Sequence, residues 1–260
     1  MPPYMPVILT ALGVGGATVV GALLGFIIKN PSRKFNDIIL SFAAGVMLAA
    51  AVIGLIIPSL ELGDEMSGKW GILYTVIGIF LGAVCLSLVD KLVPHLHNMS
   101  ATKGEERHPD KTKELNKVLL FVIAIAIHNL PEGIAAGVSF ATSETAQAYI
   151  VAGSIALQNI PEGMVIIAPM IAVGINRRRA FLIALATGLV EVLGTFIGYF
   201  AGSISAAILP FALAFAGGTM LYVISDEMIP ETHSHGYERA ATYSLLTGFA
   251  TMLAFDFFLG

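Results

Sequence analysis

Two short motifs carry the residue types that could bind a cation. They read His128-Asn-Leu-Pro-Glu132-Gly and Gln158-Asn-Ile-Pro-Glu162-Gly, so both contain Asn-x-Pro-Glu-Gly. Residues four apart lie on one face of a helix, which places the imidazole beside the carboxylate in the first motif and the amide beside the carboxylate in the second. Carboxylate and amide oxygens together with one imidazole nitrogen form a ligand set for a divalent metal ion.

A third carboxylate extends this constellation. Glu191 lies near the middle of another apolar segment, with Thr187 and Thr195 four residues away on either side. No Lys or Arg occurs inside the apolar segments that carry the three acids, so ion pairing within the protein is excluded. A carboxylate in the bilayer core costs about 2.5–3.5 kcal/mol on insertion scales. The three acids are therefore either protonated or neutralised by a bound cation.

Composition indicates which elements must position these side chains. Hydrophobic residues make up 56% of the 260-residue chain and charged residues only 12%, about half the share of a soluble domain. A soluble helical bundle would need polar stripes at helical spacing, which most of the apolar segments lack. The sequence therefore predicts an all-α integral membrane protein, a single polytopic domain over residues 1–260 with eight transmembrane helices. These are expected at about 7–29, 36–58, 70–92, 117–140, 147–171, 179–201, 207–230 and 241–259, with 93–116 as a mobile cytoplasmic loop.

Lysine and arginine indicate the orientation of these helices. Thirteen of the fourteen basic residues lie in the connections from an odd-numbered helix to the next helix, and only Lys69 lies on the other side. The positive-inside rule makes the basic side cytoplasmic and leaves both termini on the extracytoplasmic side. We expect the protein in the bacterial inner membrane.

The expected second and seventh helices resemble each other. Phe, Ala, Gly, Met and Leu match in register between residues 41–48 and 214–221, and each helix then reaches Ile-Pro, at Pro58 and at Pro230. Because the two helices run in opposite directions, the relation is an inverted repeat, which is common in secondary transporters. Small-residue helices rich in Met also look alike without such a relation.

Proline is expected to shape the two central helices. Pro131 and Pro161 each lie within a motif, where a proline removes a backbone donor and kinks the helix. Irregular backbone at this depth is tolerated where it lines a cavity. We therefore expect helices four and five to be kinked beside the candidate cation site.

The two motifs resemble the signature of the ZIP (Zrt/Irt-like) metal transporters, in particular the GufA-like branch, and the similarity covers essentially the whole chain. The resemblance implies import of divalent cations, with Zn²⁺ as the usual substrate and Cd²⁺, Fe²⁺ or Mn²⁺ as alternatives, and no required cofactor. It implies a homodimer in the lipid bilayer that does not bind nucleic acid. It also implies alternating access by an elevator-type movement, in which helices one, four, five and six move against the others. It also implies a binuclear metal site at the midplane formed by His128, Asn129, Glu132, Gln158, Asn159, Glu162 and Glu191.

The second motif departs from the family pattern at two positions. Many ZIP proteins have His in place of Gln158, and some have Asp in place of Asn159. An amide oxygen is a harder ligand than an imidazole nitrogen, and a neutral Asn removes one negative charge. Both changes predict weaker binding of Zn²⁺ and less discrimination against Mn²⁺ or Fe²⁺.

Acids and histidines near the helix ends predict secondary sites for metal entry and exit. On the expected outer side, Glu61 belongs to an acidic cluster that could raise the local cation concentration. On the expected cytoplasmic side, the candidates for accepting a released ion are Asp90, His95, Asp226, Glu227, Glu231, His233 and His235. A solvated polar rim is the alternative interpretation of both groups.

Three other functions are alternatives to a metal carrier. A metal-selective channel remains an alternative. An intramembrane metallohydrolase would typically carry His-Glu-x-x-His, which is absent from the sequence. A proton-coupled carrier of an organic substrate would need aromatic or Arg anchors near the motifs, and none is evident. We therefore expect a transporter rather than an enzyme.

Overall fold

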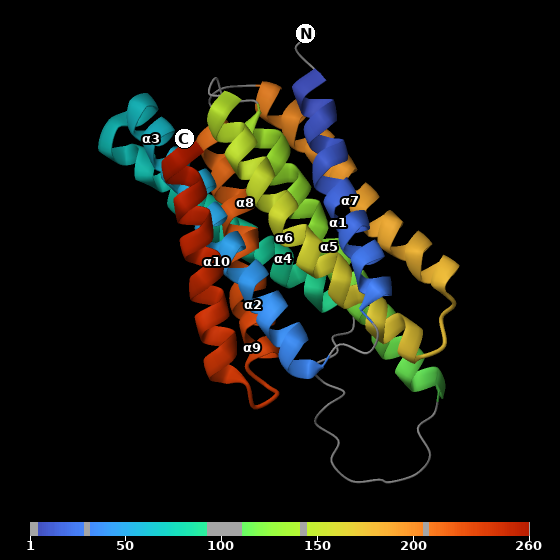
Figure 1. Ribbon diagram of the computed structural model, residues 1–260. Helices are drawn as coiled ribbons and strands as arrows, with labels where there is room; N and C mark the ends of the chain where they lie inside the picture. Colours follow the sequence, from blue (N-terminus) through green and yellow to red (C-terminus); the bar gives the residue numbers. More distant parts are fainter. Residues whose placement is uncertain (1–4, 29–31, 93–110, 141–144, 205–207, 260) are drawn as a thin grey trace.

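The structure, a computed structural model, describes residues 5–28, 32–92, 111–140, 145–204 and 208–259, and these form helices joined by short turns (Figure 1). Two π-helical segments, η1 and η5, join α2 to α3 and α8 to α9, and the 3₁₀ turn η2 joins α3 to α4. The elements are α1 (Met5–Ile27), α2 (Arg33–Ala49), η1 (Ala50–Ile56), α3 (Ile57–Ser67), η2 (Gly68–Gly71), α4 (Ile72–Leu92), α5 (Lys111–Ser139), α6 (Thr145–Ala172), α7 (Arg177–Ile204), α8 (Leu209–Val223), η5 (Ile224–Met228), α9 (Ile229–Thr232) and α10 (Glu238–Leu259).

Several of these elements are long and apolar enough to cross a membrane. One such segment, Arg33–Leu88, is 56 residues long and reverses direction at Gly68, whose φ of 57° favours glycine. Large apolar side chains such as Phe80 and Phe257 are exposed, as lipid contact requires. The all-helical membrane class is therefore confirmed for the described residues, in which the six candidate spans are Met5–Ile27, Arg33–Leu88, Ala148–Ala172, Arg177–Gly202, Leu209–Thr232 and Glu238–Phe258.

The prolines occupy two kinds of position. Pro58 and Pro230 stand at the beginning of α3 and α9, directly after the two π segments. A proline ring clashes with the carbonyl four residues earlier, and a wider π turn relieves that clash, so each helical run continues past its proline. The helical run that the sequence predicts to end near residue 58 extends through α3 to Ser67. Pro131 and Pro161 lie inside α5 and α6, and each of these is one continuous helix.

The helices form two groups (Figure 1). In the first group, α1 packs against α6 and α7, and α5 packs against α7. In the second group, α2 packs against α10, and α4 packs against α8. Contacts between the groups are sparser and run mainly from α2 and η1 to α6 and from α5 to α8.

Glycines bring the helices of the first group into backbone contact. A methyl group built on Gly21 of α1 would lie 2.1 Å from the carbonyl oxygen of Ile160 in α6. A methyl group on Gly133 of α5 would lie 2.2 Å from the carbonyl oxygen of Glu191 in α7. Helix backbones approach this closely only where a small residue sits at the crossing. The first group is therefore interlocked around the residues of the two motifs.

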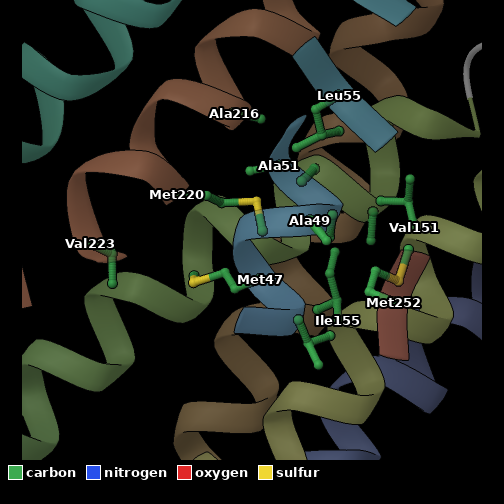
Figure 2. Packing of buried hydrophobic residues seen from close by; sticks show 14 of the residues in the cluster. Met47, Ala49, Ala51, Leu55, Val151, Ile155, Ala216, Met220, Val223 and Met252 are labelled. Atoms are coloured by element: carbon green, nitrogen blue, oxygen red, sulfur yellow. The ribbon is translucent and has the colours of Figure 1, made fainter. Parts of the chain in front are cut away.

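Side chains rather than backbones fill the boundary between the groups, as Figure 2 shows. Met47 and Met220 from the second group belong to one buried apolar cluster with Val151 and Ile155 of α6. At Gly54 of η1, a methyl group would meet the side chain of Val151 at 2.5 Å rather than any backbone atom. Over the described residues, the boundary is thus filled by apolar side chains, and Gly54 meets a side chain where Gly21 and Gly133 of the first group meet backbone atoms.

Replacing Gly21 by alanine tests this interlocking. The added methyl would overlap the Ile160 carbonyl, and overpacking of this kind costs about 1–3 kcal/mol of stability. We expect a lower thermal unfolding midpoint for Gly21→Ala in detergent. Gly13→Ala in the same helix is the matched control, because nothing lies within 4 Å of its added methyl. Equal midpoints for the two variants would contradict the described packing of α1 on α6.

Candidate metal centre

Glu191 of α7 joins four helices at one point. Its fully buried carboxylate accepts three hydrogen bonds, each from a side chain on a different helix. Thr18 of α1 donates to Oε1 over 2.7 Å, Asn129 of α5 donates to Oε1 over 2.5 Å, and Asn159 of α6 donates to Oε2 over 2.6 Å. Both oxygens of Glu191 are thereby occupied in this conformation.

The two asparagines are held in one orientation. Besides its bond to Glu191, the amide nitrogen of Asn129 donates to the Thr187 carbonyl (3.3 Å), and that of Asn159 donates to the Val14 carbonyl (3.2 Å). The Oδ1 atoms of both asparagines are buried and have no hydrogen-bond partner. Each amide therefore directs its nitrogen to Glu191 and a backbone carbonyl, and its oxygen can still accept a hydrogen bond or bind a metal ion.

Glu132 and Gln158 form a second hydrogen-bonded contact between a carboxylate and a side-chain amide. Gln158 Nε2 donates to Glu132 Oε1 over 2.7 Å, and both side chains are fully buried. Glu132 Oε2 and Gln158 Oε1 have no partner. With the two asparagine oxygens, four buried acceptors on α5 and α6 lack a donor.

Four unpartnered acceptors are an unusual arrangement, because buried polar atoms are almost always hydrogen-bonded. The centre consists of carboxylates, amides, the Thr18 hydroxyl and the backbone carbonyls of Val14 and Thr187. Residues 5–27 and 145–172 contain no Lys or Arg. A cation that prefers oxygen ligands would satisfy the acceptors and offset the charge of the carboxylates. The arrangement is therefore a candidate metal centre.

Two further predicted ligands, Glu162 and His128, lie on the same two helices as these acceptors. Glu162 of α6 is buried, with 7% of its surface exposed, on the same helix as Gln158 and Asn159. His128 belongs to α5, but its side chain lies outside the described residues, so its predicted position beside Glu132 stays a prediction. Among the described residues no group of three His, Cys, Asp or Glu side chains is close enough to hold a metal by itself. Among the described residues, the candidate centre therefore combines carboxylate oxygens with amide oxygens.

The hydroxyls of Thr187 and Thr195, four residues on either side of Glu191, bond to the backbone of their own helix. Thr195 Oγ1 donates to the Glu191 carbonyl, and Thr187 Oγ1 donates to the Ala184 carbonyl. Thr187 contributes to the centre only through its own carbonyl, which accepts from Asn129. Hydroxyls in apolar helices commonly bond to the preceding turn in this way.

Thr18 and Val14 belong to the centre but were missed by sequence reasoning. Thr18 is 173 residues from its partner Glu191, and Val14 contributes only its backbone carbonyl. The one available signal was a hydroxyl in an otherwise apolar helix, which usually turns inward to a partner. That signal does not name the partner.

The predicted exit residues lie along the η5–α9 segment and its following turn. Asp226 is exposed and Glu227 partly buried in η5, and Glu231 is exposed in α9. His233 uses both ring nitrogens: Nδ1 lies 2.9 Å from the Ile229 carbonyl and Nε2 lies 3.1 Å from Thr242 Oγ1. His233 therefore links α9 to α10.

The remaining secondary candidates are spread over both ends of the helices. His235 Nδ1 donates to Asp37 Oδ1 of α2 over 3.0 Å, and its Nε2 lies 3.9 Å from Glu231 Oε1. Glu61 is an exposed residue of α3. His95 and the side chain of Asp90 lie outside the described residues.

Comparison of the sequence with known proteins identifies the family. The sequence profile described as ZIP zinc transporter matches residues 97–256. The chain is 42% identical to zinc transporter GufA of Myxococcus xanthus, over 97% of this chain and 98% of that protein. It is 39% identical to zinc transporter ZIPB of Bordetella bronchiseptica, over 94% and 78% of the two chains. It is 30% identical to zinc transporter ZIP11 of Homo sapiens, over 94% of each. These matches confirm the resemblance of the motifs: the chain belongs to the ZIP zinc transporter family and is a transporter rather than an enzyme.

Proposed function

We propose that this protein carries divalent transition-metal cations, Zn²⁺ first among them, across the membrane toward the cytoplasm. The observation that carries the proposal is the set of four buried, unpartnered acceptor oxygens on α5 and α6 beside buried carboxylates. The names of the relatives, all zinc transporters, support Zn²⁺ as the substrate. Cd²⁺, Fe²⁺ and Mn²⁺ are further candidates because amide oxygens discriminate less among divalent ions than imidazole does.

The proposed binding site is binuclear. Glu132, Gln158 and Glu162 supply oxygens on one side, and Asn129 and Asn159 supply the two amide oxygens aligned by Glu191. In this conformation Glu191 orients the asparagines, and it becomes a direct ligand only after one amide turns away. The proposed ligands, with the imidazole included, are His128, Asn129, Glu132, Gln158, Asn159, Glu162 and Glu191.

The proposed movement is a displacement of α1, α5, α6 and α7 against the other helices. Glycine contacts such as Gly21 on Ile160 support rigidity within the moving group. The apolar boundary around Met47 and Met220 supports movement between the groups, because side-chain contacts can exchange while interlocked backbones cannot (Figure 2). The centre lies entirely within the first group, so a bound ion would travel with it.

We propose eight transmembrane helices with an inverted repeat. In both α2–α3 and α8–α9, a π segment separates the shared Phe-Ala-x-Gly-x-Met-Leu motif from Ile-Pro. The two runs cross the protein in opposite directions (Figure 1), which supports the inverted relation. Kinks at Pro131 and Pro161 belong to the same proposal.

The setting of the protein completes the proposal. The asymmetric distribution of Lys and Arg supports an orientation in which η5–α9 and the beginning of α2 face the cytoplasm. Both chain termini would then lie on the extracytoplasmic side of the bacterial inner membrane. We propose a homodimer, as the family resemblance implies, with no required cofactor. Glu61 would attract ions at the entrance, and Asp90, His95, Asp226, Glu227, Glu231, His233 and His235 would receive them at the exit.

Uptake into proteoliposomes tests this function. Vesicles containing the purified protein should accumulate Zn²⁺ and Cd²⁺, and also Mn²⁺ and Fe²⁺, above empty vesicles. The uptake should saturate with external metal and fall steeply on cooling, because a carrier must change conformation in every cycle. No accumulation of any of the four metals across a range of external pH would contradict the proposal. Flux that rises linearly with the ion gradient would favour the metal-selective channel.

A further inference from the structure

Unpartnered buried polar atoms occur at a second place in the protein. Six buried side-chain nitrogen and oxygen atoms of the described residues lack a hydrogen-bond partner, and four of them belong to the metal centre. The other two are Asp37 Oδ2 and Ser41 Oγ, both on α2. Residues four apart share one helix face, so the two oxygens lie one turn apart on the same side of α2.

Asp37 is buried, and among the described residues it has no Lys or Arg partner. Its surface is 3% exposed, and its one hydrogen bond links Oδ1 to His235 Nδ1 over 3.0 Å. Ser41 is fully buried in the next turn toward the middle of α2. A carboxylate at such a position is costly unless it is paired or binds a cation.

We propose that Asp37, Ser41 and His235 form a second cation site between the metal centre and the end of the bundle where α2 begins. The ion would be bound by the Asp37 carboxylate, by the Ser41 hydroxyl and by His235 Nδ1, with water completing its coordination. The Nδ1 and Oδ1 atoms lie 3.0 Å apart, close to the separation of about 3.3 Å between two ligands of one tetrahedral Zn²⁺.

The hydrogen bond between His235 and Asp37 shows how the ion would enter. The ion replaces the proton between Nδ1 and Oδ1, and the single proton of the neutral imidazole then resides on Nε2. Glu231 Oε1 lies 3.9 Å from Nε2, beyond hydrogen-bond distance, so it supplies only a nearby negative charge on that side of the ring. A negative charge on that side of the ring favours the tautomer that carries its proton on Nε2 and leaves Nδ1 free for a metal.

The place of this site suggests its role. Asp37 lies in the second turn of α2, about 6 Å along the helix from its beginning at Arg33. The site has one carboxylate, whereas the metal centre has three, so it should bind the ion more weakly and pass it on. This role rests on the proposed function, but binding at the site is measurable without transport.

Binding of Cd²⁺ to a variant with a disabled centre tests the proposal. The purified Glu132→Gln/Glu162→Gln protein should retain one weakly bound Cd²⁺ in equilibrium dialysis. Adding Asp37→Asn, which preserves the shape of the side chain, should weaken this binding by at least about tenfold. Adding Glu238→Gln, which removes an exposed acid at the beginning of α10, should leave it unchanged.

Two results would overturn the second site. One is a disabled-centre variant that binds no Cd²⁺, and the other is retained binding after Asp37→Asn. Ser41→Ala and His235→Gln provide the same test if Asp37→Asn fails to give a monodisperse protein, since each removes one proposed ligand. Retained Cd²⁺ in a protein whose wild type transports no metal would leave this site standing while the proposed function fails.

Discussion

Vesicles containing the Glu132→Ala variant should accumulate no more Zn²⁺ than empty vesicles. Glu132 is fully buried, and Gln158 is the side chain that donates to it. The substitution removes one charge and two oxygens of the centre and leaves the Gln158 amide without its acceptor. Even outer-shell partners of a metal typically cost roughly 10–100-fold when they are replaced, so loss of a direct ligand should cost more. Glu162→Ala is expected to behave in the same way.

Two further substitutions provide comparisons for the uptake of the Glu132→Ala variant. Glu191→Gln should only reduce uptake, because the amide oxygen still accepts from Thr18 or Asn129 while the second acceptor is lost. Glu61→Gln, at an exposed position of α3, should leave transport by the centre intact and have at most a small effect at low external metal. Normal Zn²⁺ accumulation by Glu132→Ala would remove the basis of the assignment.

Oxidation of a Gly54→Cys/Val151→Cys pair should stop uptake. Gly54 belongs to the second helix group and Val151 to the first, and a Cβ built on Gly54 would lie 3.7 Å from the Val151 Cβ. Disulfide-bonded cysteines have their Cβ atoms about 3.8 Å apart, so the bond can form without backbone movement. A covalent link across the boundary prevents the displacement that the proposed mechanism requires.

The cross-linking experiment carries its own controls. The pair is placed in a Cys85→Ser background, which removes the single natural cysteine. Reduction of the disulfide should restore uptake, and each single cysteine variant should be insensitive to oxidation. If the fully oxidised protein transports Zn²⁺ as fast as the reduced one, the two helix groups do not move against each other at this point.

Much of the centre could be predicted because its residues obey local rules. Glu132 and Gln158 follow from a repeated motif, and the sequence itself shows that residues 118–140 and 145–172 contain no Lys or Arg. Helical periodicity places the motif side chains on one face of their own helix. The free-energy cost of a buried carboxylate indicates that this face contacts a group that neutralises or hydrogen-bonds it. The all-helical membrane class follows from hydropathy for the same reason: both properties are local in sequence.

The parts that escaped prediction depend on how distant segments pack. Thr18 meets Glu191 across 173 residues, and no pattern within α1 identifies that partner. The π segments before Pro58 and Pro230 relieve the clash between each proline ring and the carbonyl four residues earlier. The sequence shows the prolines but not how the helix accommodates them. Asp37 reads as an ordinary acid near a helix beginning, and only the packing of His235 and the surrounding helices reveals its burial.

The most direct test of the central claim is a crystal structure of the Zn²⁺-bound protein with anomalous data at the zinc edge. The account predicts an anomalous peak between α5 and α6, about 2.0–2.2 Å from an oxygen of Glu132 and within reach of Gln158 and Glu162. An anomalous map with zinc only at surface residues, and with Glu132 still bonded to Gln158 alone, would contradict it.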